Sequence, residues 1–201
     1  MRGPADILYN FHWIAPGEAA RSAQAYAGFL APFLARHGIR SIVNLRGKNL
    51  RRWWWWYEAR VCERHAIPRF DLKINSRQLP TPAMLGELLD ALDRAPKPVL
   101  VKCSGGQDRT SLAAALYLIH ARGWDALDNA MAQFAGWPYL HWPKKHQRWL
   151  KLFPLFAHEA AGGAPIRQWI AKGYDPDEFA RWLQNRGMGD AFHKIYGASA
   201  S

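Results

Sequence analysis

Cysteine is scarce in this sequence, since only Cys62 and Cys103 occur in 201 residues, and this excludes a disulfide framework. No uninterrupted apolar run approaches the roughly 20 residues that a membrane-spanning helix needs. The eight histidines form no metal-ligand spacing, and residues 1–6 lack the apolar segment of a signal peptide. We therefore expect a cytoplasmic protein that uses no metal and no other cofactor.

Acidic residues are also few, at 16 against 27 Lys and Arg, which gives a net charge of +11. The segment from Arg36 to Arg69 is especially basic, because its only acidic residues are Glu58 and Glu63. A basic surface attracts phosphoproteins, inositol phosphates, lipid head groups or nucleic acid. Charge alone does not choose among these partners.

Apolar periodicity predicts strands at 11–14, 39–45, 67–74 and 99–101, with helices at 26–37, 53–65 and 81–92. This alternation predicts an α/β fold, with a central, mostly parallel sheet flanked by helices. Beyond residue 110 the pattern predicts only helices, at 111–119, 125–134, 146–156, 165–172 and 176–185. We expect a single domain over residues 1–201, with a core at about 10–160 and a C-terminal helical extension at about 161–190.

The most informative segment is the end of the strand Val99 to Val101. Cys103 follows this strand, a glycine-containing loop comes next, and Arg109 and Thr110 open the following helix. A free thiol with a pKa of roughly 8.5 is a poor nucleophile until nearby positive charge lowers that pKa. Loop amides, a guanidinium and a helix N-terminus all supply such charge, and all bind phosphate oxygens. The segment therefore predicts an anion cradle around a reactive thiolate.

This segment resembles the active-site loop of the cysteine-dependent protein tyrosine and dual-specificity phosphatases, in which a cysteine, five residues, an arginine and Ser or Thr follow in order. The match covers Cys103, Gly106, Arg109 and Thr110. Weaker similarity to bacterial dual-specificity phosphatases extends it over most of residues 10–185. The resemblance implies the phosphatase-superfamily fold and a phosphocysteine intermediate on Cys103. It also implies that Arg109 binds the phosphoryl oxygens and that Thr110 assists departure of the thiolate.

The activity that the resemblance implies is metal-independent hydrolysis of phosphoric monoesters. The substrate would be a phosphotyrosine protein, or a phosphoinositide or other phospholipid. Expected substrate contacts come from the loop and its surroundings: Ser104, Gly105, Gly106, Gln107, Lys102 and Arg46. We expect Arg21 and Arg46 either at the mouth of the site or at solvated strand ends.

Two carboxylic acids compete as the proton donor for the leaving group. Asp108 lies in the loop beside Arg109, and the ending Asp-Arg-Thr resembles myotubularin-like and some bacterial phosphatases, where this aspartate is a candidate acid. Asp71 precedes Cys103 by 32 residues, a spacing that resembles the aspartate loop of many dual-specificity phosphatases. Asp108 is favoured, because Asp71 falls within a predicted strand.

Four consecutive tryptophans, Trp53 to Trp56, follow Arg51 and Arg52. Successive helical residues are rotated by about 100°, so Trp54 and Trp55 cannot share the face of Trp53. Exposed Trp54 and Trp55 beside the two arginines would suit peripheral contact with a membrane surface. Alternatively, the late helices cover the run, or it forms a wall that stacks on a substrate ring.

Three other functions remain open. The first is a catalytically weak phosphatase-like module that binds phosphorylated or anionic partners, since Lys102 stands where the family usually has histidine. The second is a sulfurtransferase, which the spacing from Cys103 to Arg109 disfavours. The third is a nucleic-acid-binding module, which leaves the cysteine loop unexplained. We therefore expect no specific nucleic-acid partner.

Overall fold

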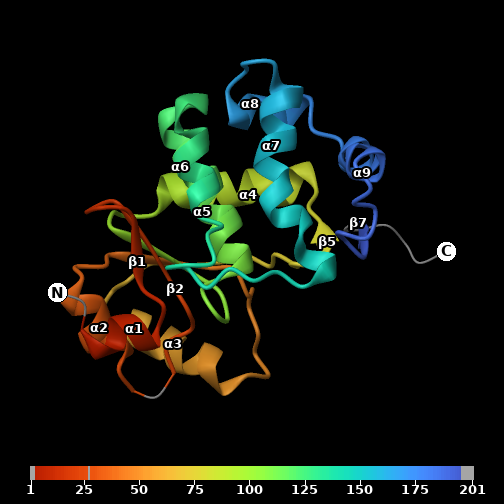
Figure 1. The fold of residues 1–201 in the computed structure, drawn as a ribbon. Coiled ribbons are helices and arrows are strands. Elements are labelled where there is room, and N and C mark those ends of the chain that lie inside the picture. Colours follow the sequence, from red (N-terminus) through yellow and green to blue (C-terminus); the bar gives the residue numbers. More distant parts are fainter. Residues whose placement is uncertain (1–2, 27, 196–201) are drawn as a thin grey trace.

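The computed structural model describes residues 3–26 and 28–195 and contains a five-stranded sheet (Figure 1). In spatial order its strands are β1 (His12–Ala15), β2 (Ala19–Ser22), β6 (Val99–Lys102), β3 (Ser41–Asn44) and β4 (Arg69–Asp71). The last four strands pair in parallel, and only the edge strand β1 is antiparallel. The predicted central, mostly parallel sheet is therefore confirmed.

Helices cover both faces of the sheet, as parallel strands require. One face carries α1 (Pro4–Leu8), α2 (Leu30–Arg36) and α3 (Trp53–Arg64), and the other carries α4 (Pro82–Arg94), α5 (Asp108–Arg122), α6 (Leu127–Ala132) and α7 (Trp149–Ala161) (Figure 1). Strand β6 separates two hydrophobic clusters, because Leu100 packs on the α2–α3 side while Val99 and Val101 pack on the α5 side. Side chains alternate between faces along a strand, so Lys102 points toward α3 and Cys103 toward the α5 side.

Helix α5 holds the functional loop in place. It is buried continuously from Thr110 to Ile119, since α4, α6, α7 and the sheet surround it. Neighbouring α4 begins as its sequence predicts, with the Thr81 hydroxyl accepting a hydrogen bond from the Met84 N–H (3.2 Å) and Pro82 in the first turn. A rigid central helix of this kind fixes the orientation of the residues at its N-terminus.

The C-terminal part is helical, as expected, with α8 (Ile166–Lys172) and α9 (Pro176–Asn185) beyond α7 (Figure 1). Its aromatic side chains join the main hydrophobic cluster; Phe153 and Phe156 both contact Phe179 of α9. A short β7 (Lys194–Ile195) then pairs in parallel with β5 (Gln78–Leu79). Among the described residues, no helix has the length and apolarity that crossing a bilayer would require.

Several elements differ from the sequence-based expectations. Strand β2 was not predicted, because its Ala-Ala-Arg-Ser composition is a poor strand signal, yet it pairs on both edges. The strand expected at 67–74 is limited to Arg69–Asp71, and the helix expected from residue 146 begins at Trp149. These boundaries depend on which strands and helices pair in the folded protein, and local apolar periodicity carries no information about that pairing.

The tryptophan run, whose exposure the sequence left open, opens α3 and is buried in part. Trp54 and Trp55 are 5% and 6% exposed, whereas Trp53 and Trp56 are 62% and 48% exposed. The Arg46 guanidinium lies 3.5 Å from the Trp54 ring centroid, and the Arg69 guanidinium lies 4.4 Å from that of Trp55. The expected membrane contact through Trp54 and Trp55 is therefore wrong, because both rings are covered by arginines at the strand ends.

Candidate active site

The loop between β6 and α5 is shaped by contacts to its carbonyl oxygens. Asn10 Nδ2 donates to the carbonyls of Gly105 (3.2 Å) and Gly106 (3.3 Å), and Arg21 Nη2 donates to that of Gly106 (3.0 Å). In a trans peptide the N–H points opposite to the C=O. The amides of Gly106 and Gln107 are therefore directed away from Asn10 and Arg21, as a phosphate cradle requires.

Position 106 of the loop requires glycine. Its φ of +65° lies in the left-handed region, and a Cβ atom there would stand 2.6 Å from the Ser22 carbonyl carbon and the Ala23 nitrogen. The loop thus passes directly against the end of β2. Any side chain at this position would displace the loop from that strand.

Cys103 is buried at the base of the loop, with its side chain on the α5 side of the sheet. Burial acts to raise the pKa of its thiol, but the Arg109 guanidinium, the Thr110 hydroxyl and the N–H groups of Gln107 and Thr110 together hold that pKa below its ordinary value. These groups stabilise the thiolate, which is the nucleophilic form. Cys103, Arg109 and Thr110 are therefore brought together as the sequence predicts.

Arg109 extends from the first turn of α5 toward the carboxyl end of β3. Its Nη1 makes only long contacts, to the carbonyls of Leu45 (3.4 Å) and Ile74 (3.5 Å). No carboxylate pairs with it in the described part of the chain, so its fork is available for an anion. Ser104 and Gly105 are exposed and Gln107 is partly exposed, so the loop is open to solvent.

Asp108 meets a buried histidine that sequence analysis did not select. Its Oδ1 lies 3.5 Å from Nε2 of His141, and both atoms lack another partner within the described residues. Burial lowers the pKa of His141 to about 4, so the ring is neutral at pH 7, and its other nitrogen is engaged by the Phe134 backbone. Burial also raises the pKa of Asp108, although Arg109 opposes this effect. The Asp108 carboxyl thus faces a neutral ring nitrogen, and its raised pKa favours the protonated form that a general acid needs.

Asp71 has a different environment. It aligns with Asn44 and Lys102 across the sheet, so its side chain faces α3, on the opposite side from Cys103. Its oxygens accept from Asn44 Nδ2 (2.7 Å), Trp55 Nε1 (2.9 Å) and Arg69 Nη2 (3.1 Å). These three donors fix the carboxylate as an acceptor, and the geometry favours Asp108 over Asp71 as the candidate acid.

Lys102, which was expected to contact substrate, is buried on the α3 side. Its Nζ lies 2.6 Å from Glu58 Oε2 and 2.7 Å from Gln24 Oε1. Burial lowers the pKa of Lys102, and the neighbouring Glu58 opposes this shift. A substrate in the loop has no access to this ammonium, so the expectation of direct contact is corrected. Arg46 remains partly exposed beside the site and donates to the Tyr26 hydroxyl (3.1 Å).

Arg21 is the second correction, because it is fully buried rather than placed at a mouth or a solvated strand end. His141, which sequence analysis did not single out, is likewise buried. Neither residue carries a local signal of its role, since their partners are distant in sequence. Within the described residues no group of three or more potential ligands forms a metal site.

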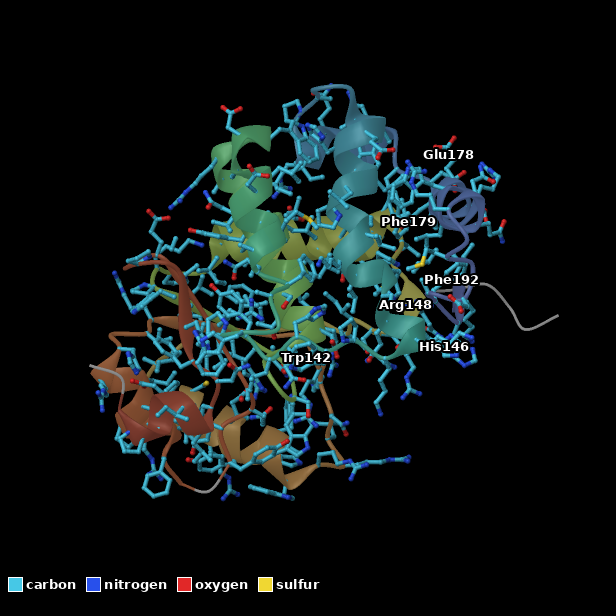
Figure 2. All side chains as sticks on the ribbon, in the orientation of Figure 1. Trp142, His146, Arg148, Glu178, Phe179 and Phe192 are labelled. Atoms are coloured by element: carbon cyan, nitrogen blue, oxygen red, sulfur yellow. The ribbon has the colours of Figure 1, made fainter. Side chains whose placement is uncertain are left out.

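Aromatic side chains lie on two segments that contact the loop, since the Gln24 N–H donates to the Ser104 carbonyl (3.0 Å) and His141 lies beside Asp108. On one side the rings of Tyr26 and Trp53 lie 5.8 Å apart. On the other, the exposed Trp142 follows His141, and Figure 2 places it beyond the start of α5. His146 and Arg148 lie apart from it, toward β7, where both contact Asp190. The surface next to the loop, which we call its entrance, therefore combines aromatic rings with the cation of Arg46, whose Nη1 donates to Gln24 Oε1 and to the Tyr26 hydroxyl.

The family comparison decides the identity of this arrangement. The family PTP-SAK, described as "Swiss Army Knife protein, DSP-PTPase phosphatase domain", matches residues 8–146. The chain belongs to this DSP-PTPase family. It is therefore a phosphoric monoester hydrolase of the protein-tyrosine-phosphatase-like class, which confirms the expected superfamily. No curated protein matches the chain.

Solved structures agree on the DSP-PTPase fold. TpbA of P. aeruginosa matches with a TM-score of 0.54 and 21% identity, over 92% of this chain and 95% of its own. The core catalytic domain of the PP-IP phosphatase SIW14 from S. cerevisiae matches with a TM-score of 0.52 and 18% identity, over 89% and 93%. Tk-PTP matches with a TM-score of 0.54 and 20% identity, over 72% and 95%. At these identities the similarity establishes the fold.

Proposed function

We propose that this DSP-PTPase hydrolyses phosphomonoesters through a phosphocysteine on Cys103, with Asp108 as the general acid. The observation that carries the proposal is the Cys103 thiol, whose pKa is held below its ordinary value by Arg109 and the groups at the start of α5. Such a thiolate attacks a phosphorus atom while Arg109 and the amides of residues 104–108 hold the three equatorial oxygens.

In the first step the thiolate forms a bond to phosphorus and the bond from phosphorus to the ester oxygen breaks. The ester oxygen takes the electron pair and receives a proton from Asp108. In the second step water attacks the phosphocysteine, the Asp108 carboxylate accepts its proton, and the thiolate leaves with a hydrogen bond from Thr110. The raised pKa of Asp108 supports its part, because the acid must be protonated before each turnover.

The proposed substrate is an anionic phosphomonoester, either a phosphotyrosine protein or a phosphoinositide or other phospholipid. The net charge of +11 and the cationic, aromatic entrance support this class. A Cys-to-Ser variant of TpbA has been crystallised in complex with pTyr, and SIW14 is named a PP-IP phosphatase, so proteins of this fold are described with more than one kind of phosphate compound. A reactive thiol also needs a reducing compartment, which supports the expected cytoplasmic location.

The test of turnover uses Cys103→Ser, which should abolish hydrolysis of an aryl phosphate while vanadate still binds. Undiminished hydrolysis by this variant would refute the proposal. A phosphate-release panel of phosphotyrosine peptides, phosphoinositides and phosphatidylglycerol phosphate then identifies the substrate. Of the tryptophan run, Trp53 and Trp56 are exposed enough to affect activity on vesicles, so replacing them should matter only if lipids are substrates.

A second candidate function is a phosphate-binding module with little turnover. It is favoured by the buried pair of Lys102 and Glu58, which replaces the histidine that the family usually has before the cysteine. Pre-steady-state measurement separates the two functions, because a binding module would release no burst of phenol from an aryl phosphate.

A further inference from the structure

Arg21 on β2 is a buried guanidinium whose partners are all uncharged. Nη1 donates to the Gln133 carbonyl (2.9 Å) and to its Oε1 (3.0 Å), while Nη2 donates to the Gly106 carbonyl (3.0 Å) and to Ser111 Oγ (2.7 Å). The guanidinium carbon lies 4.2 Å from the Tyr139 ring centroid. No aspartate or glutamate within residues 3–26 and 28–195 pairs with it.

A buried charge without a counter-charge is costly, and proteins normally pair it or neutralise it. Burial lowers the pKa of Arg21 only to about 10, so the group remains cationic at neutral pH. Its ionisable surroundings are His12, which lies opposite it on β1, Tyr139 and His141 on the loop after α6, and Cys103 after β6. His141 is neutral at pH 7. Cys103 is the acid in this set whose pKa is held below its ordinary value, so its thiolate is the candidate counter-charge for Arg21.

The sheet explains how Arg21 reaches this position. Ala19 packs on the α5 side and Ala20 on the α2–α3 side, so Arg21 points toward α5, as Cys103 does. Arg21 also aligns with Val101, two residues before Cys103 on the neighbouring strand. From there its Nη2 reaches the Gly106 carbonyl, which points opposite to the Gln107 N–H that donates to Cys103.

We propose that Arg21 is a second fixed cation of the catalytic loop, which holds Cys103 as a thiolate from behind without touching the substrate. Arg109 faces Cys103 from α5, together with the Thr110 hydroxyl, and is occupied by phosphoryl oxygens once substrate binds. The charge of Arg21 stays in place throughout the cycle, because its hydrogen bonds go to protein groups and not to the phosphoryl oxygens. It is a positioning residue, and it also holds the Gly106 carbonyl outward.

This inference rests on the proposed role of Cys103 as nucleophile, but its test measures ionisation of the thiol rather than turnover. The full chain is alkylated with iodoacetamide across a pH series, and the rate is read at the Cys103 peptide by mass spectrometry. Burial raises the pKa of the other cysteine, Cys62, to about 12, so its reaction does not interfere. If the chain showed no phosphatase activity but the pKa of Cys103 responded to the substitutions as predicted, only the proposed function would be refuted.

Two substitutions remove the effective charge. Arg21→Met should raise the pKa of Cys103 by about one unit or more, so that about tenfold less thiolate is present below that pKa. Gln133→Glu places a carboxylate where Oε1 now lies, 3.0 Å from Nη1, and should shift the pKa in the same direction while preserving the hydrogen bond. Gln133→Glu is nearly isosteric, so it decides the question even if Arg21→Met does not fold.

Two controls keep the charge. Arg21→Lys retains a cation, and Ser111→Ala removes one hydrogen bond from Arg21 without changing any charge. Both should leave the pKa of Cys103 close to that of the wild type. An unchanged pKa in folded Arg21→Met or in Gln133→Glu would overturn the proposal. An equal rise in all four variants would also overturn it, because Arg21 would then act only as a scaffold.

Discussion

Replacing Asp108 by asparagine removes the proposed proton donor with little change in shape. Loss of a general acid costs about 10²–10⁴-fold in rate, which corresponds to about 3–5 kcal/mol of transition-state stabilisation. The structure adds a pH signature, because burial raises the pKa of Asp108 above its ordinary value of 3.8. The wild-type kcat should therefore fall on the basic side as Asp108 loses its proton, and this basic limb should be absent in Asp108→Asn.

The assay compares kcat against pH for two aryl phosphates that differ in the pKa of the leaving phenol. Asp108→Asn should lose most rate with the more basic phenol, which needs the proton most. Asp71→Asn is the matched control, because it alters an aspartate on the opposite face of the sheet. The reasoning is refuted if Asp71→Asn loses the basic limb while Asp108→Asn keeps it.

Three further predictions concern stability and loop geometry. Because the pKa of Asp108 is raised in the folded state, its contribution to the free energy of unfolding is fully present below the unfolded pKa and is lost as pH rises through the folded pKa. Denaturant titration should therefore show Asp108→Asn gaining stability relative to wild type as pH rises from about 4 toward 7. A parallel pH dependence of the two proteins would contradict this. Gly106→Ala should lower the free energy of unfolding by about 1–3 kcal/mol and weaken vanadate binding, because the loop must leave β2 and adopt a strained φ. Vanadate binding that calorimetry finds unchanged would show that the contact between the loop and β2 is dispensable. Glu58→Gln should lower the free energy of unfolding by about 3–5 kcal/mol, measured by urea titration, because it leaves the Lys102 ammonium buried without a counter-charge. The double variant Glu58→Leu with Lys102→Met removes both charges and should recover most of that loss. Equal losses in both variants would contradict the pairing argument.

The features that follow from local sequence were predictable. The run Val99 to Val101, the glycine loop and the buried helix after Arg109 place the proposed nucleophile, phosphate ligand and assisting hydroxyl on one strand–loop–helix unit. The N-cap at Thr81 and the parallel sheet followed from equally local patterns. Each of these depends on residues that are close in the chain, where spacing specifies geometry.

Features that depend on long-range pairing were not predictable. Lys102 pairs with Glu58 of α3, and Arg21 donates hydrogen bonds to Gln133, which follows α6, and to Ser111 of α5. Nothing near these residues in the sequence indicates the contacts. The burial of Trp54 follows in the same way from Arg46 at the end of β3. The partner of Asp108 lies on the loop after α6, so the preference for Asp108 gained its physical reason only from the fold.

The most direct test of the account is to look for the covalent intermediate. The full chain is mixed with an aryl phosphate, quenched in acid within the first turnover, and digested for mass spectrometry. The account predicts one phosphoryl group on the peptide that contains Cys103, with its amount rising as the burst of phenol is released. Steady turnover with no phosphoryl group on Cys103 at any quench time would contradict it.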